Sequence, residues 1–182
     1  EQAYAEHGRR VAAILIEPMQ GEGGDNHFRS EFLAELRRIA DERESLLIFD
    51  EVQTGFFGSG KPWWWQHHEV APDIVSFGKK TQVCGIYASD RVLEVPDNVF
   101  QLSSRINSTW GGNLVDMVRC RRFIEICEAE ERCTHVAEMG DRLMTGLRDM
   151  ARRTGAFSNV RGKGSLVAVS VDSPERRGQY EF

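Results

Sequence analysis

Two short apolar segments, each ending in a charged residue, place the strongest constraint on how this 182-residue chain folds. Residues 46–49 (LLIF) are followed by Asp50, and residues 74–77 (IVSF) are followed by Gly78 and Lys79. A carboxylate and an ammonium at the tips of two buried strands are costly to desolvate unless something occupies the space between them. The pattern therefore predicts two buried strands whose ends share a polar site.

Segments with strand and helix patterns alternate along the rest of the chain. Residues 11–16 (VAAILI) are typical of a fully buried strand in a parallel sheet, and a glycine-rich loop follows. Ser30 is positioned to cap a helix over residues 31–43. Further elements are expected as a short strand at 85–89, helices at 114–130 and 132–153, a chain break at 161–164 and an alternating strand at 165–171. This order predicts an α/β fold with a mainly parallel sheet.

The bulk composition narrows the functional class. The net charge of −5, from 23 basic and 28 acidic residues, argues against a nucleic-acid-binding surface. No signal peptide and no apolar run of transmembrane length is visible, so no membrane partner is expected. The four cysteines lack C-x-x-C spacing, which makes a metal or redox site unexpected and predicts reduced thiols in the cytoplasm.

Polar residues follow three of the predicted strands, at 17–20, 50–53 and 78–80. Ligands of open α/β sheets collect beyond the carboxyl ends of the strands, so these residues would converge on one crevice. A lysine there either forms a structural ion pair or is desolvated and becomes a nucleophile that forms a Schiff base. The residues alone favour the ion pair and leave the Schiff base open. Pyridoxal phosphate would suit the second case, because it needs a lysine for its aldehyde and a carboxylate for its ring nitrogen.

Four motifs occur in order along the chain: EPMQGEGGD at 17–25, DEVQTGF at 50–56, PDIVSFGKK at 72–80 and NSTWGGN at 107–113. Together they resemble the signature of the class III aminotransferases, which are pyridoxal-phosphate enzymes of fold type I. Four ordered motifs are a more specific signal than a single glycine motif. Within the class, residues 78–85 and 104–113 are most similar to the lysine 6-aminotransferase subfamily. The 4-aminobutyrate enzymes usually depart from the GGN ending, and the acetylornithine and ornithine enzymes usually have a single lysine.

The resemblance implies roles for residues at the strand ends. Lys79 would hold the cofactor as a Schiff base and later move a proton at the substrate carbon, while Lys80 points elsewhere because adjacent side chains diverge. Asp50 would bind the pyridine nitrogen and keep it protonated, which makes the ring an electron sink. Val52 would pack on the ring face, and Gln53 would reach the phenolic oxygen of the cofactor.

Residues at the rim of the site are implied in the same way. Ser108 and Thr109 would contact the cofactor phosphate, with Thr109 completing the site of a neighbouring subunit, so a homodimer is implied. Glu22 is the candidate for a switch that releases an arginine outside this chain when 2-oxoglutarate binds. Glu17 is either a substrate-side residue or a structural acid at a strand end.

Several neighbouring residues have more ordinary interpretations. Asp50 could instead cap a turn, and Glu51 is expected to point away from the site as a surface or structural acid. Residues 63–65 (WWW) favour packing in the core and at a subunit interface over lining the substrate site. His67 and His68 lack a third ligand at helical spacing, so no metal site is predicted.

The resemblance implies transfer of a terminal amino group, with L-lysine and 2-oxoglutarate giving 2-aminoadipate 6-semialdehyde and glutamate. The alternatives are 4-aminobutyrate, ornithine or acetylornithine as the donor, a mutase, racemase or decarboxylase reaction on the same fold, and an inert product of a truncated gene. Because the family's chains are longer, this one is expected to be an internal fragment. Residues 1–158 would be the second half of the cofactor-binding large domain and residues 159–182 the start of the small C-terminal domain. We expect these residues alone to bind cofactor weakly and to be inactive.

Overall fold

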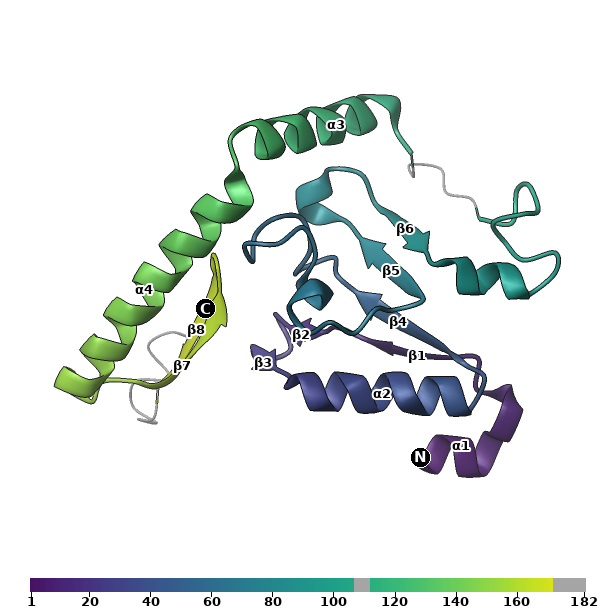
Figure 1. The fold of residues 1–182 in the computed structure, drawn as a ribbon, viewed down its shortest axis with the longest axis horizontal. Coiled ribbons are helices and arrows are strands. Elements are labelled where there is room, and N and C mark those ends of the chain that lie inside the picture. The colour runs from purple at the N-terminus through teal and green to yellow at the C-terminus, as the bar shows by residue number, and fades with distance from the viewer. Residues whose placement is uncertain (107–111, 172–182) are drawn as a thin grey trace.

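A four-stranded sheet organises the first half of the chain (Figure 1). The computed structural model describes residues 1–106 and 112–171. The strands lie in the order β1 (Ala13–Ile16), β4 (Leu46–Asp50), β5 (Ile74–Phe77) and β6 (Gly85–Ala88). The first three are parallel, and β6 pairs antiparallel with β5. The predicted α/β class with a mainly parallel sheet is confirmed.

One face of this sheet, called here the covered face, packs against α2 (Ser30–Glu42). Alternate strand residues point to the same face, and the apolar ones on this side meet the apolar stripe of the helix. The centre of this core consists of residues with 0% exposure, namely Leu33, Ala40, Leu47, Phe49 and Val75. Burial of their apolar surface contributes about 25 cal/mol per Å² to the stability of the fold.

The opposite face, called here the open face, has no such cover among the described residues. Leu15 of β1 is 66% exposed there. Ile86 of β6, which pairs through Ser76 with Asp50 and so lies on the same face, is 40% exposed. Asp50 is therefore on the open face, one residue away from the buried Phe49.

The start of α2 differs from the prediction. Arg29 occupies the N-cap position, Ser30 is the first helical residue, and the cap makes no side-chain hydrogen bond. The Ser30 hydroxyl instead lies 2.9 Å from Nδ1 of His68. The predicted Ser30 cap is wrong because a contact with a distant segment takes its hydroxyl.

Short elements connect the main ones. Inside the predicted glycine-rich loop, β2 (Met19–Gln20) pairs antiparallel with β3 (Asn26–His27). The remaining short elements are α1 (Gln2–His7) and the 3₁₀ turns Gly8–Arg10, Trp64–His67, Lys79–Thr81 and Asp90–Glu94.

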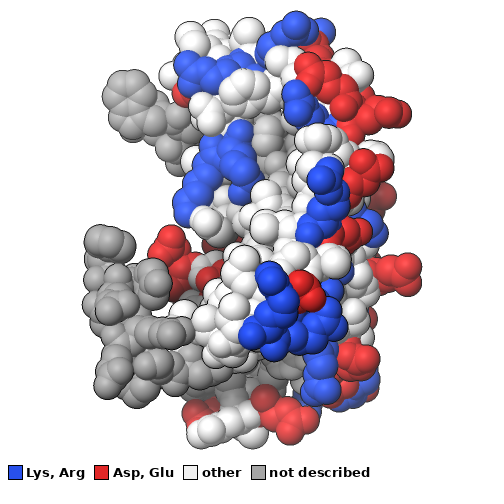
Figure 2. All heavy atoms as spheres, turned by 90° about the vertical axis from the view of Figure 1, so that its left-hand side faces the viewer, with Lys and Arg blue, Asp and Glu red and all other residues white. Residues whose placement is uncertain are grey.

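Two long helices, α3 (Leu114–Ala129) and α4 (Arg132–Thr154), follow within one or two residues of the predicted bounds. Asn113 caps α3, because its Oδ1 accepts the Val115 N–H at 3.0 Å. Gly155 ends α4 in the left-handed conformation, at φ 60°. Figure 2 looks at the side of the molecule where α4 lies and shows basic and acidic side chains interspersed. No helix in the described part of the chain is both long and apolar enough to cross a membrane.

The chain ends its described part in a hairpin of β7 (Ser158–Lys163) and β8 (Leu166–Ser170), which lies beside α4. The predicted break at 161–164 is wrong, because Arg161 pairs with Ala168 and Lys163 with Leu166. The sequence RGKG resembles a loop because it contains two glycines. Both have positive φ angles, 142° at Gly162 and 57° at Gly164, but Gly162 lies within β7 and only Gly164 belongs to the turn.

The turn of this hairpin lies in close backbone contact with two other segments. A Cβ on Gly164 would come within 2.6 Å of the Gly58 carbonyl oxygen, and a Cβ on Gly140 of α4 within 2.5 Å of the Gly164 Cα. The Ser165 N–H and hydroxyl donate to the same Gly58 carbonyl at 2.9 and 2.8 Å. We call this contact the glycine junction; it ties the hairpin to the loop after β4 and to α4.

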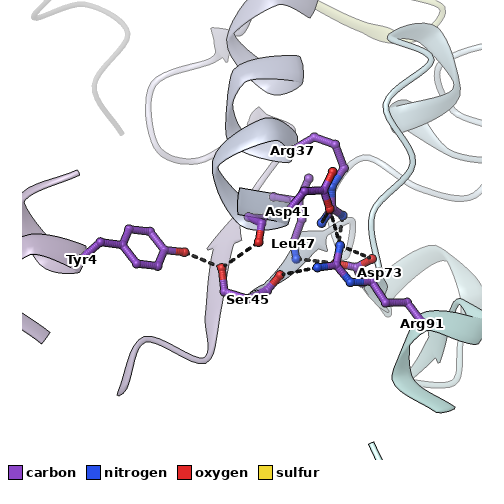
Figure 3. A network of polar contacts seen from close by, with 8 residues as sticks. Tyr4, Arg37, Asp41, Ser45, Leu47, Asp73 and Arg91 are labelled. Atoms are coloured by element: carbon purple, nitrogen blue, oxygen red, sulfur yellow. Dashed lines mark hydrogen bonds and ion pairs between the residues drawn. The ribbon is translucent and has the colours of Figure 1, made fainter. Parts of the chain in front are cut away.

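A polar network fixes the amino-terminal ends of β4 and β5 (Figure 3). Asp73, only 5% exposed, accepts the Leu47 N–H at 2.7 Å and an Arg37 N–H at 2.8 Å. The network also includes Tyr4, Asp41, Ser45 and Arg91. Because it lies at the end of the strands opposite Asp50, it stabilises the sheet without entering the polar site.

Candidate functional site

The carboxyl ends of the parallel strands surround one hollow of about 180 Å³. Its lining consists of Glu17, Glu22, Asp50, Val52, Gln53 and Lys79. These are the residues that the sequence assigned to cofactor and substrate, except Ser108 and Thr109, which lie outside the described residues. The parallel strands explain the convergence, because they deliver their following residues to the same edge of the sheet.

Lys79 is held in an unusual backbone conformation at the rim of this hollow. Its φ is 52°, in the left-handed region that costs a residue other than glycine about 1–3 kcal/mol and that is often found at functional sites. The Lys79 carbonyl accepts the backbone N–H of Gln82 at 3.0 Å and its side-chain Nε2 at 3.2 Å. The Lys79 Nζ donates to the Oε1 of Gln53. The backbone thus sets where the Lys79 side chain leaves the main chain, and the Gln53 amide is the partner of its amine.

Lys80 is directed differently and does not line the hollow. Its Nζ donates to the backbone carbonyl of Gln53. Burial lowers the pKa of the half-buried Lys80, the charge of Lys79 lowers it further, and the carboxylate of Glu51 opposes both. The structure therefore gives the two adjacent lysines different surroundings. The Lys80 contact was not foreseen, because a bond to a backbone carbonyl leaves no mark in the sequence.

Asp50 ends β4 with one carboxylate oxygen bound and one available. Its Oδ1 accepts the Val52 N–H at 3.0 Å, which is the turn-capping contact. Its Oδ2 makes no hydrogen bond within the described residues. The geometry accommodates both interpretations of Asp50 at once, since one oxygen can fix the turn while the other faces a ligand.

Glu51, the next residue, is a buried structural acid with 1% exposure. It accepts the backbone N–H groups of Trp64 at 2.7 Å and Trp65 at 2.9 Å, and the Thr54 hydroxyl at 3.1 Å. Burial raises the pKa of its carboxyl group, and these hydrogen bonds oppose that rise. It points away from the hollow, as predicted, but the surface alternative is wrong.

The three tryptophans form part of the core, as predicted, and their predicted packing at a subunit interface stays a prediction. Trp64 is 2% exposed, and the Trp63 ring lies 5.1 Å from that of Tyr87 and 6.0 Å from that of Phe77. None of the three lines the hollow.

No group of three metal-binding side chains occurs in the part of the chain that the structure describes.

The two glutamates of the loop after β1 differ in their contacts. Glu17 Oε2 accepts the Gly21 N–H at 3.3 Å, so this carboxylate fastens its own loop. Glu22 is exposed and makes no polar contact within the described residues. A second hollow of about 290 Å³ shares Glu22 and Gln53 with the first and extends toward Leu166 of β8. The loop after β1 therefore lines both hollows, which adjoin each other at Glu22 and Gln53.

The donor set of the first hollow fits pyridoxal phosphate. An amine (Lys79) and a carboxylate with an available oxygen (Asp50) face one space. These are the groups that bind the aldehyde and the ring nitrogen of this cofactor. The residues predicted to hold its phosphate lie outside the described residues, so the fit concerns the ring half of the site.

Comparisons with known proteins agree with this arrangement. Residues 1–181 match the family described as aminotransferase class-III. An L-lysine-epsilon aminotransferase from Mycobacterium tuberculosis is 49% identical over 178 residues, which cover 97% of this chain and 40% of that protein. One from Streptomyces clavuligerus is 45% identical over 181 residues, with 99% and 39% covered. A solved lysine aminotransferase from M. tuberculosis aligns with a TM-score of 0.93 and 49% identity, over 97% of this chain and 41% of that one. The chain thus spans about 40% of the length of the relatives it matches.

Proposed function

Because this chain belongs to the class III aminotransferase family and has its fold type I architecture, we propose that it carries the reaction centre of a pyridoxal-phosphate-dependent lysine 6-aminotransferase. The reaction converts L-lysine and 2-oxoglutarate into 2-aminoadipate 6-semialdehyde and L-glutamate. The observation that carries the proposal is the single hollow lined by Lys79, Asp50 and Gln53. The identities of 49% and 45% to two lysine-epsilon aminotransferases support lysine as the donor.

The cofactor supplies an aldehyde that binds amines and a ring that accepts the electron pair left when a proton departs. Lys79 is the residue that would bind the cofactor aldehyde, and its free amine would move the proton at the donor carbon that bears the amino group. Asp50 would accept the N–H of the ring nitrogen and keep that nitrogen protonated. Val52 would pack on the ring, and Gln53, which accepts from the Lys79 amine, would reach the phenolic oxygen.

The loop after β1 serves the substrates. Glu22 is available to pair with an arginine and release it when the second carboxylate of 2-oxoglutarate arrives, and its lack of a partner within the described residues supports this role. Glu17 lines the same hollow but also binds the Gly21 N–H, so a structural role and a substrate-side role both suit it.

The assembly and its surroundings are also part of the proposal. Ser108 and Thr109 would hold the cofactor phosphate, Thr109 in the site of the neighbouring subunit, and the active form would then be a homodimer. The four cysteines are free, which agrees with a reducing cytoplasm.

The domain division falls at residues 158 and 159. Its support is that β7 and β8 form a sheet of their own, separate from the main sheet. Residues 1–158 belong to the cofactor-binding domain and 159–182 begin the small one. The 182 residues alone bind cofactor weakly and do not turn over, in keeping with relatives of which they span about 40%.

A donor panel tests this proposal. The protein from the complete reading frame that contains this chain is given pyridoxal phosphate and 2-oxoglutarate, together with lysine, ornithine, acetylornithine, 4-aminobutyrate or 2-aminoadipate. Glutamate formation is followed for each donor. Preference for lysine, with a cyclising semialdehyde as the product, is the expected result. Preference for another donor would keep the family and overturn the substrate, and bound cofactor without any transamination would indicate a mutase, racemase or decarboxylase.

A further inference from the structure

Gln53 is held on three sides in this structure. Its Oε1 accepts from Lys79 Nζ, and its backbone carbonyl accepts from Lys80 Nζ. On the third side it packs on the loop after β1, where a Cβ on Gly21 would come within 2.7 Å of the Gln53 Cγ. Both lysines thus bind the same residue, one through its side chain and the other through its main chain.

The surroundings of Lys80 keep its ammonium at that carbonyl. Its side chain is half-buried and runs beside Gly58, where a Cβ would lie 3.6 Å from the Lys80 Cε. The nearby carboxylate of Glu51 is engaged with the N–H groups of Trp64 and Trp65 and makes no ion pair within the described residues. The Lys80 ammonium therefore has the Gln53 carbonyl as its hydrogen-bond partner among the described residues.

The two lysine contacts have different consequences for the reacting amine. Gln82 holds the Lys79 main chain from the carbonyl side, whereas the exposed Lys79 side chain has the Gln53 amide as its partner. The position of the Gln53 amide depends on the main chain of the turn after β4, and Lys80 binds that main chain directly. Loss of the Lys80 contact therefore loosens the Gln53 amide and leaves the Lys79 backbone in place.

We propose that Lys80 is a positioning residue for this reaction: it holds the turn at Gln53 so that the Gln53 amide stays on the Lys79 amine. The role of Lys80 in the reaction rests on the proposed function, whereas its contact with Gln53 is seen in the structure. In this role Lys80 acts through Gln53 and does not touch substrate or cofactor.

A double-mutant cycle without cofactor tests this coupling. The four proteins are the wild type, Lys80→Met, Gln53→Ala and the double variant, each made from the complete reading frame and freed of cofactor. The rate at which an amine-specific reagent modifies Lys79 is measured at one fixed pH by mass spectrometry of the peptide that contains it. Asp50, Glu17 and Glu22 also face Lys79 across the hollow, and they are the same in all four proteins.

Lys80→Met has two effects on the labelling rate of Lys79. Loss of a neighbouring positive charge acts in either background and cancels in the cycle. Release of the Gln53 amide exposes the Lys79 amine to the reagent only where Gln53 is present, because that amide oxygen accepts from the amine. We therefore expect Lys80→Met to raise the labelling rate at least about threefold more in the wild-type background than in the Gln53→Ala background.

Equal changes of the labelling rate in the two backgrounds would overturn the proposal. Lys80→Arg keeps both a charge and a donor and is expected to retain the wild-type labelling rate; a rate like that of Lys80→Met would also contradict the proposal. If Lys80→Met does not fold, Lys80→Gln takes its place in the cycle. Because no cofactor or substrate is used, a failed donor panel leaves this result standing, and equal changes leave the proposed reaction standing.

Discussion

The two faces of the main sheet are built from the same strands but have opposite properties. The covered face has Leu47, Phe49 and Val75 fully buried against α2, whereas the open face exposes Leu15 and carries Asp50. Alternation along a strand is enough to separate the two, because Phe49 and Asp50 are neighbours in sequence. In β4 the residue that stabilises the core, Phe49, is followed directly by the residue that lines the hollow, Asp50. We therefore expect a substitution at one of them to affect stability and a substitution at the other to affect ligand binding.

The adjacent acids Asp50 and Glu51 repeat this division at the end of β4. Glu51 is buried, with both oxygens engaged by N–H and O–H donors. Asp50 lies in the hollow with one oxygen available. A carboxylate that is fully satisfied holds the turn together, and one that is half satisfied can bind a ligand.

The largest effect on activity is expected for Lys79→Ala, a substitution in the hollow at the ends of the strands. Transamination by the complete protein should fall by about 10⁴-fold, because the amine proposed to move the proton is removed. The free energy of unfolding should change little, since the Lys79 side chain is exposed. Turnover and urea unfolding are measured on the same preparation, with Lys163→Ala as the matched control. Residual turnover close to that of the control would remove Lys79 from the reaction.

The next effect falls on the covered face. Phe49→Ala should lower the free energy of unfolding by about 3–5 kcal/mol, because it leaves a cavity in a fully buried core. Leu15→Ala on the open face should change it by less than about 0.5 kcal/mol, as is usual for an exposed site. Urea unfolding of both variants checks the difference. Equal losses would mean that the open face is covered in solution.

A smaller effect is expected for Asp50→Asn. Loss of the charge that we propose to pair with the ring nitrogen should weaken pyridoxal-phosphate binding by at least about thirtyfold. The amide is nearly the same shape, and its oxygen can still accept the Val52 N–H, so stability should be retained. Cofactor titration monitored by absorbance measures the affinity. Unchanged affinity would assign Asp50 to the turn alone.

The smallest effect concerns Glu51 and pH. Burial raises the pKa of this carboxyl group in the folded protein, so the folded state binds its proton more tightly than the unfolded chain does. Its contribution to stability is therefore complete below the unfolded pKa of about 4.3 and is lost as the pH rises through the folded pKa. The loss amounts to about 1.4 kcal/mol for each pH unit that separates the folded pKa from the unfolded one.

Urea unfolding between pH 4 and pH 8 checks this, with Glu51→Gln as the comparison. The variant loses an acceptor for one tryptophan N–H, so it should be less stable throughout, but the decline with pH should be absent. The same decline in both proteins would show that another group causes it.

The sequence predicted most of what alternation and helical spacing control. Strands β4 and β5, the helices α2, α3 and α4 and the meeting of Lys79 with Asp50 all follow from local patterns and from the rule for parallel strand ends. What the sequence did not predict has two causes. The contacts of the Ser30 hydroxyl and of the Lys80 ammonium each depend on a segment far away in the chain. The pairing of Arg161 with Ala168 lies within one hairpin and was missed because RGKG resembles a loop. Residue type alone does not encode such contacts.

The glycine junction has a consequence for dividing the chain into complementary pieces. At Gly140 and Gly164 main chain meets main chain, and even a methyl group would force the segments apart. The bend at Gly155, in contrast, has open space around its Cα. A cut at Gly155 would leave the three segments of the junction intact. Because an isolated hairpin is at most marginally stable, we expect the smaller piece to fold only where α4 and the loop at Gly58 contact its turn.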